Sequence, residues 1–272
     1  MRLLLNIINK ELKKLILWLN CNRLALNISK TNFVIFCAHN KPLHKNVTIL
    51  LGKQAIEQRD CVKYLGLLID SKLQFKEHIA TINKKISRTI GLMTKLRYYM
   101  NQDTFKLIYH GLIHPYLNYG ITTWGNSAIT TIAPLYILQK RAVRLICDQN
   151  FLINEFRKPP SAPLFKKLSI LTINDLFKYE LLKFVYNSLT KSNPRQFHDY
   201  YNFSSSTITT TNVRENKLIL PISRTTNYGL KSLRFIGAKT WNSIPLSLRS
   251  STSLKVFTIK IKEYLICNYS CN

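Results

Sequence analysis

Acidic side chains are the first residues to weigh, because enzymes that join or cleave nucleic acids commonly hold two metal ions between neighbouring carboxylates. The aspartates of this chain each stand alone in the sequence, at Asp60, Asp70, Asp103, Asp148, Asp175 and Asp199. No Asp-Asp, Asp-x-Asp or Asp-Glu pair occurs. The pattern predicts no two-metal catalytic site within this sequence, and we expect no catalytic residue in it.

Other chemistry-bearing motifs are also missing. There is no GxxxxGK, GxGxxG, HExxH or GxSxG segment, and 8 glycines in 272 residues are few for a phosphate-binding loop. Cys37, His39 and His44 suggest a metal site, but no fourth ligand follows at a fitting spacing. We interpret them as polar loop residues, and we expect no metal or other cofactor to be bound by this chain.

The charge of the chain points to its partner. Forty Lys and Arg against 13 Asp and Glu give a formal net charge of +27, which indicates a polyanion. Nucleic acid is the first candidate, an anionic membrane surface is the second, and a role of the charge in solubility alone is the third. No apolar run reaches the 18 or so residues that cross a bilayer, so we expect no transmembrane segment.

The cysteines and the N-terminal segment bear on location. The 6 cysteines include no CxxC pair, and most lie in apolar runs, which is typical of reduced thiols in an intracellular protein, nuclear or cytoplasmic.

Residues 1–30 are basic and amphipathic, like a mitochondrial presequence. Their apolar stripe nevertheless continues at helical spacing towards the next segment, as a packed helix would, through Leu5, Ile8, Leu12, Leu15 and Leu19.

Short apolar runs after this helix predict strands at residues 33–36, 47–51 and 61–69. We expect the last two to form a hairpin joined by the longer loop 52–60. Residues 61–69 are apolar on both faces, so this strand requires cover from both sides.

The period then becomes helical from residue 74 to residue 99, with Ile79, Ile82 and Ile86 on one face. The remaining faces carry the cations Lys84, Lys85, Arg88, Lys95 and Arg97. A second helix, marked by Phe105, Ile108, Tyr109 and Leu112, is expected to end near Pro115. These residues predict a basic helical hairpin.

A third helix is predicted at residues 132–147, where Lys140, Arg141 and Arg144 cluster. A binding face and a solvated face would look alike here, and both interpretations stay open. Aromatic residues lie among the cations and are able to stack on bases, although core packing is favoured for most of them: Tyr98, Tyr99, Tyr109, Tyr116, Tyr119 and Trp124.

The remaining segments complete an α+β fold that is predominantly helical. A Pro-rich break at 158–163 precedes a helix at 174–189, and a Ser/Thr/Asn-rich segment without a helical stripe follows at 191–215. The tail resumes at 233–245 and ends in a helix at 254–266.

Five segments in this order carry a family resemblance: WLNCNRLALNISKTNFVIF, VKYLGLLID, HIATINKKISRTIGLM, YLNYGITTWGN and TNYGLKSLRFIGAKTWNSIP. The series resembles the C-terminal part of the reverse transcriptases, or RNA-directed DNA polymerases, of non-LTR retrotransposons of the jockey-like kind. The similarity covers almost the whole chain.

The resemblance implies a division along the chain. Residues 1–72 would be a remnant of the polymerase palm with its β-hairpin, 73–115 the helical thumb, 116–190 a helical post-thumb region, 191–215 a linker or irregular segment, and 216–272 a C-terminal segment. The catalytic aspartates of the family lie on a YADD-type hairpin before this region. We therefore expect them, and the Mg²⁺ of the full-length family, to lie outside this sequence, and expect the chain alone to be inactive.

The resemblance also implies roles for single residues. Lys30 matches the lysine of the NxxKT segment, and residues 62–69 match the primer-grip strand, with Lys63 and Tyr64 as nucleic-acid contacts. The basic helix at 74–99 matches the thumb, which follows the minor groove through phosphate contacts. The implied partners are an RNA template and an RNA/DNA or DNA duplex, with no small-molecule substrate. The oligomeric state stays open.

Two other functions fit the same residues. One is a non-enzymatic basic RNA- or DNA-binding protein, or a repurposed structural module. The other is a peripheral membrane protein that binds anionic lipid.

Overall fold

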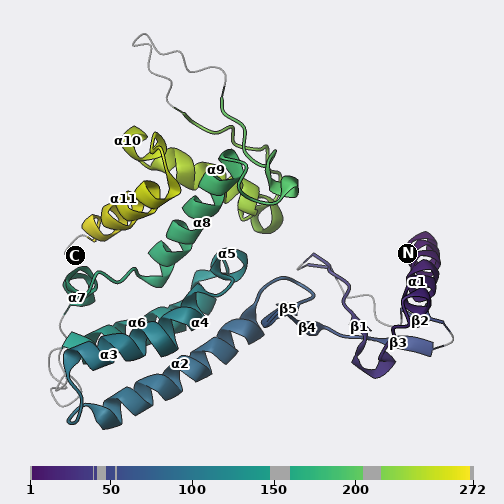
Figure 1. Cartoon of the computed structure of the whole chain (residues 1–272), viewed down its shortest axis with the longest axis horizontal. Helices are drawn as coiled ribbons and strands as arrows, with labels where there is room; N and C mark the ends of the chain where they lie inside the picture. The colour runs from purple at the N-terminus through teal and green to yellow at the C-terminus, as the bar shows by residue number, and fades with distance from the viewer. Residues whose placement is uncertain are drawn as a thin grey trace. The chain divides into compact units, whose positions relative to one another are not determined.

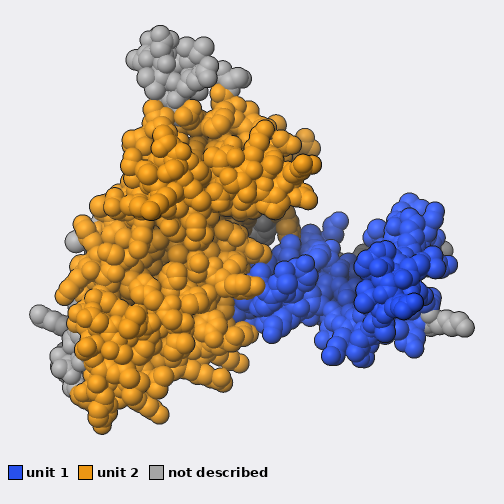
Figure 2. Space-filling model, viewed as in Figure 1, with its two compact units in different colours: residues 1–80 blue, residues 81–272 orange. Residues whose placement is uncertain are grey.

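The computed structural model describes residues 2–38, 40–41, 47–52, 54–147, 160–204 and 216–269. The chain divides into two compact units, residues 1–80 and 81–272, which Figure 2 shows in blue and orange. The described residues are predominantly helical with two small sheets, which confirms the predicted α+β class. The finer division at residues 72, 115, 190 and 215 stays a prediction, and residues 148–159 and 205–215 lie outside the described ranges.

Unit 1 begins with a long helix on a small sheet. Its first sheet has the strand order β1-β3-β2, with β1 parallel and β2 antiparallel to β3. Asn9 of the helix accepts a hydrogen bond from the Leu50 amide of β2 at 3.2 Å through its side-chain oxygen. The elements are α1 (Arg2–Cys21), η1 (Ile28–Lys30), β1 (Asn32–Phe33), β2 (Ile49–Leu51) and β3 (Gln54–Gln58).

The predicted apolar stripe of α1 is right except at one position. Leu5, Ile8, Leu12 and Leu19 are half-buried, but Leu15 is 44% exposed and Ile16 is half-buried in its place. The next residue along the chain thus takes the inward position, because a straight helix of 3.6 residues per turn drifts away from a strict 3,4 spacing.

A second sheet corrects the predicted hairpin. Residues 61–69 do not form one strand; they form the tight hairpin β4 (Cys61–Tyr64) and β5 (Leu67–Asp70). Leu65 and Gly66 are its two loop residues, and both have positive φ, 45° and 85°, as a type I′ turn requires. The expected loop 52–60 contains β3, which pairs with β2. The hairpin residues are half-buried or exposed, so the expected cover on both faces is not found within the described residues.

Asp70 organises the passage from β5 to α2 (Lys76–Leu96). Its carboxylate accepts backbone hydrogen bonds from Lys72 and Gln74, both at 3.0 Å, and from Phe75 at 2.6 Å. Three backbone amides thus donate to this one carboxylate, so Asp70 shapes the loop before the helix.

The helical hairpin of unit 2 is longer than predicted. After α2, the helices α3 (Gln102–Ile108), η2 (Tyr109–Ile113) and α4 (His114–Asn118) follow one another directly (Figure 1). The helix therefore does not end near Pro115, which lies in the first turn of α4, where its missing N–H is tolerated. In the π-helical turn η2, the His114 amide donates to the Tyr109 carbonyl. The wide turn adds one residue, so Ile113 is buried and the predicted core residue Leu112 is 46% exposed.

Helix α8 is the centre of unit 2. It packs against α4, α5, α6, α9 and α11 (Figure 1). The predicted helices at 132–147, 174–189 and 254–266 are confirmed within a few residues, and residues 233–245, for which no element type was predicted, contain helix α9. The remaining elements are α5 (Ile121–Trp124), α6 (Ile129–Cys147), α7 (Ser161–Lys167), α8 (Ile173–Leu189), η3 (Arg195–Phe197), η4 (Thr226–Leu230), α9 (Leu233–Ser243), α10 (Leu246–Arg249) and α11 (Leu254–Cys267).

Two of the quoted segments supply packing residues of this unit. Trp124 and Trp241 are fully buried or nearly so. A Cβ on Gly125 would lie 2.6 Å from the Ile121 carbonyl oxygen and 2.7 Å from the Phe177 ring, so only glycine allows α5 to approach α8 this closely. The two segments also meet, because the Asn126 side chain donates to the Lys231 carbonyl at 3.0 Å.

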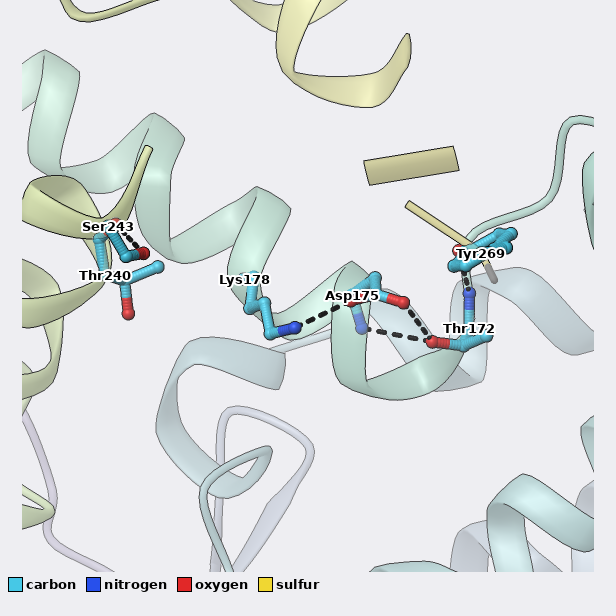
Figure 3. Close-up of polar contacts among 6 residues, drawn as sticks. All are labelled: Thr172, Asp175, Lys178, Thr240, Ser243 and Tyr269. Carbon is cyan, nitrogen blue, oxygen red and sulfur yellow. Dashed lines mark hydrogen bonds and ion pairs between the residues drawn. The ribbon is translucent and has the colours of Figure 1, made fainter. Parts of the chain in front are cut away.

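The start of α8 ties the end of the chain to the core, as Figure 3 shows. Thr172 is the N-cap, and its hydroxyl donates to the Asp175 carboxylate at 2.6 Å. The Thr172 amide donates to the Tyr269 hydroxyl at 2.9 Å, and Lys178 pairs with Asp175 at 2.9 Å. The Thr172 amide thus holds Tyr269, shortly after α11, at the start of α8.

Candidate nucleic-acid interface

Three exposed cations form one row on α2, which we call the cation row: Lys84, Arg88 and Lys95. Each lies two residues from a buried position of the stripe Ile82, Ile86, Ile90 and Met93. Two helical residues correspond to a rotation of roughly 200°, so the row lies opposite the buried stripe. At 1.5 Å per residue it extends over about 16 Å.

The cation row lies in a stretch of α2 without acidic residues, and the acid of this helix, Glu77, is in its first turn. Residues 81–96 contain no Asp or Glu. Among the ion pairs of the described residues, none involves Lys84, Arg88 or Lys95. The row therefore presents positive charge outward, as phosphate binding requires.

Lys85 and Arg97, the other predicted cations of α2 and its end, lie against tyrosines. The Lys85 ammonium is 4.8 Å from the centroid of the Tyr116 ring on α4. The Arg97 guanidinium carbon is 4.4 Å from the centroid of the Tyr98 ring. Stacking of this kind orients a cation without cancelling its charge.

The predicted cluster on α6 is less open than the cation row. The Lys140 ammonium lies 4.4 Å from the Tyr136 ring centroid. Burial raises the pKa of Tyr136, the Asp175 carboxylate raises it further and Arg144 lowers it. Arg141 is exposed. The cluster thus combines one exposed cation with two half-buried ones, Lys140 and Arg144.

Lys30, Lys63 and Tyr64 belong to unit 1, and the other predicted site residues belong to unit 2. Lys30 ends η1, where its amide donates to the Asn27 side chain at 3.2 Å and its own side chain is exposed. Lys63 and Tyr64 are exposed on β4, opposite Leu68 and Leu67 of β5. All three side chains are accessible to a partner.

The six aromatic candidates differ in how exposed their side chains are. Tyr109 and Trp124 are fully buried, as expected for core residues. Tyr98, Tyr99, Tyr116 and Tyr119 are exposed, so core packing is the wrong interpretation for most of the six. The helical period did not reveal this, because the turn after α2 and the wide turn η2 both interrupt it.

The described residues offer no group of three or more His, Cys, Asp or Glu side chains that fits a metal ion. His39 and His44 lie outside the described residues. The carboxylate of Asp70 is occupied by backbone amides. The described residues therefore do not fit the two Mg²⁺ ions that the family resemblance implies for the full-length enzymes.

No helix in the described part of the chain has both the length and the hydropathy needed to cross a bilayer.

Three proteins of Drosophila melanogaster mobile elements are similar to this chain. The probable RNA-directed DNA polymerase from transposon BS is 27% identical over 135 residues, which cover 47% of this chain and 15% of that protein. The probable RNA-directed DNA polymerase from transposon X-element is 22% identical over 165 residues, or 58% of this chain and 17% of that protein. The RNA-directed DNA polymerase from mobile element jockey is 29% identical over 101 residues, which cover 36% of this chain and 11% of that protein.

The chain is related to the RNA-directed DNA polymerases of jockey-like mobile elements. This confirms the resemblance to non-LTR retrotransposon enzymes. Each match spans less than a fifth of the length of the jockey-like polymerase concerned. The activities of those whole polymerases can therefore be assigned to this chain only as a proposal. No protein-family model matches the chain, and no solved structure matches it.

Proposed function

We propose that this chain is a nucleic-acid-binding part of a non-LTR retrotransposon RNA-directed DNA polymerase, in which α2 acts as the thumb helix on a template–primer duplex. The observation that carries the proposal is the cation row, Lys84, Arg88 and Lys95, which lies opposite the buried stripe of α2. The buried stripe fixes the rotation of the helix about its axis. The row is therefore held outward whether or not a partner is bound.

Phosphate binding by this row is electrostatic and independent of base sequence. Each cation that meets a phosphate releases condensed counterions, so the affinity depends steeply on salt. Lys85 on α2 and Arg141 on α6 are further exposed cations, and we expect both to contribute to phosphate binding. In unit 1, Lys63 and Tyr64 of the β4–β5 hairpin contact the primer strand, and Lys30 is a further phosphate contact.

The proposed partners are an RNA template and its RNA/DNA or DNA duplex, met in the nucleus or the cytoplasm. The proposal assigns binding to this chain and no metal-dependent step. The sequence has no neighbouring pair of acidic residues that would hold two Mg²⁺ ions. We expect the purified chain not to incorporate dNTPs on an RNA template with Mg²⁺.

Fluorescence anisotropy with a labelled RNA/DNA duplex tests this function. The wild-type chain is expected to bind, and the K84A/R88A/K95A variant to bind at least about tenfold more weakly at moderate salt. The matched control is K239A/K255A/K260A, which removes the same charge from exposed positions on α9 and α11. Circular dichroism checks that both variants remain folded.

The control variant distinguishes binding at the cation row from attraction to the overall net charge of the chain. Equal losses in the two variants would mean that net charge alone drives binding. Binding to anionic vesicles that survives competition by RNA, with no duplex binding, would favour the membrane function instead.

A further inference from the structure

Two adjacent tyrosines stand out at the turn between α2 and α3. Tyr98 is 65% exposed and Tyr99 is 85% exposed. Single exposed apolar residues are ordinary on protein surfaces. Two neighbouring aromatic rings at the end of a helix that carries a cation row indicate a contact surface, because the fold leaves most of each ring uncovered.

The backbone of this turn is held at both ends. The Tyr99 amide donates to the Leu96 carbonyl at 3.0 Å, at the end of α2. At the start of α3, the Asn101 side chain caps the helix by accepting from the Thr104 amide at 2.9 Å. The Arg97 guanidinium stacks on the Tyr98 ring and donates to its hydroxyl. The rings are thus presented from an ordered turn.

The charge around the turn is positive. Lys95, Arg97 and Lys106 lie within a few residues of the tyrosines, and the one acid of this stretch, Asp103, is paired with Lys106 at 3.1 Å. A partner that binds both the tyrosine rings and the cations must carry flat π-faces as well as negative charge. Nucleic-acid bases and phosphates supply this combination.

We propose that Tyr98 and Tyr99 stack on unpaired bases of the nucleic acid whose phosphates the cation row binds. The inference rests on the proposed function and adds a second kind of contact to it. In a duplex the faces of interior bases are covered by their neighbours, so only unpaired bases or a strand end offer a free face. The hairpin therefore recognises a junction between duplex and single strand, with the duplex on α2 and the single strand at the turn.

The test compares a short blunt RNA/DNA duplex with the same duplex carrying an unpaired extension on one strand or the other. Anisotropy titrations are run on the full chain. The wild type is expected to bind at least one extended duplex about tenfold more tightly than the blunt duplex, since stacking of one base on an aromatic side chain contributes that much. The Y98A/Y99A variant is expected to lose this preference and to bind the blunt duplex as the wild type does.

Two further variants make the result specific. Y98F/Y99F keeps the rings and is expected to keep the preference. Y228A removes an exposed tyrosine elsewhere in unit 2 and is expected to change nothing. Melting temperatures of all variants confirm that they fold.

Equal binding of blunt and extended duplexes by the wild type would overturn the stacking proposal while leaving the proposed function intact. A preference that persists in Y98A/Y99A would also overturn it. Failure of the wild type to bind any duplex would instead refute the proposed function. Loss of binding to phosphatidylserine vesicles in Y98A/Y99A, with the duplex preference unchanged, would assign the turn to a membrane.

Discussion

The side-chain amide nitrogen of Gln139 donates to the Tyr109 hydroxyl at 2.9 Å in the core of unit 2. The same nitrogen donates to the Leu171 carbonyl at 2.9 Å, and the Gln139 side-chain oxygen accepts from the Ile173 amide at 2.8 Å. One buried side chain thus joins η2, α6 and the start of α8. This residue therefore helps to position the basic hairpin against the rest of unit 2, together with the packing of α3 on α6 and of α4 on α8.

Replacing Gln139 by Leu is expected to lower the free energy of unfolding of unit 2 by about 2–4 kcal/mol, because the Ile173 amide and the Leu171 carbonyl lose their partner in the core. Tyr109→Phe is expected to cost only about 1 kcal/mol, since Gln139 keeps two of its three bonds. Urea unfolding followed by tryptophan fluorescence measures both, since Trp124 and Trp241 are buried in unit 2. Equal stabilities of Q139L and wild type would show that this network contributes nothing.

Gly125→Ala is expected to destabilise unit 2 by about 1–3 kcal/mol, because the new methyl group would overlap the Ile121 carbonyl and the Phe177 ring. Gly91→Ala is the matched control. A Cβ at Gly91 of α2 meets no atom within 4 Å, so the change is expected to stabilise the helix by up to about 1 kcal/mol. Thermal unfolding measures the stability of both variants, and a G125A variant as stable as G91A would contradict the packing described.

Acid is expected to destabilise unit 2 through His110 and His114, whose ring centroids are 5.8 Å apart. Burial lowers the pKa of both, and Lys262 of α11 lowers both further. At His114, His110 also lowers the pKa and Glu180 of α8 raises it. Since the folded pKa values lie below the unfolded value of about 6.5, the unfolded chain binds more protons in acid. The free energy of unfolding therefore falls as the pH drops below about 6.5 and is unaffected by these groups above it.

The measurement is the melting temperature of unit 2 at pH 7.5 and at pH 5.5. Lys262→Met is expected to reduce the loss at the lower pH, because it removes a positive neighbour of both imidazoles. An H110N/H114N variant that loses as much stability in acid as the wild type would rule these histidines out as the cause.

The helices of unit 2 were predictable because their signal is local. The stripe of α2 repeats at helical spacing through Ile79, Ile82 and Ile86, and all three are buried. The row Lys84, Arg88 and Lys95 followed from the same period. Asn101 before α3 and Thr172 before α8 are N-cap residues of the preferred types.

The hairpin β4–β5 was missed because its turn lacks the usual residues. Type I′ turns favour Asn-Gly or Asp-Gly, and here Leu65 occupies a left-handed position that a branched apolar residue rarely adopts. The run CVKYLGLLID therefore resembled one continuous strand. Tertiary pairing of the two halves overrides the local preference.

The π-helical turn η2 was equally hidden. A single extra residue before Pro115 moves Ile113 inward in place of Leu112. No residue type in this segment predicts such a wide turn. Tyr116 and Tyr119 follow this interruption, and Tyr98 and Tyr99 lie in the turn after α2, so the helical period did not separate these exposed tyrosines from the core aromatics. Such features depend on how a helix meets its neighbours and not on its own sequence.

The salt dependence of duplex binding tests the central claim most directly. A plot of log binding constant against log salt concentration is expected to be less steep for K84A/R88A/K95A than for the wild type, by about two to three in slope, one phosphate contact per cation. The K239A/K255A/K260A control is expected to keep the wild-type slope. Identical slopes for all three proteins would contradict the claim that the cation row of α2 binds the phosphate backbone.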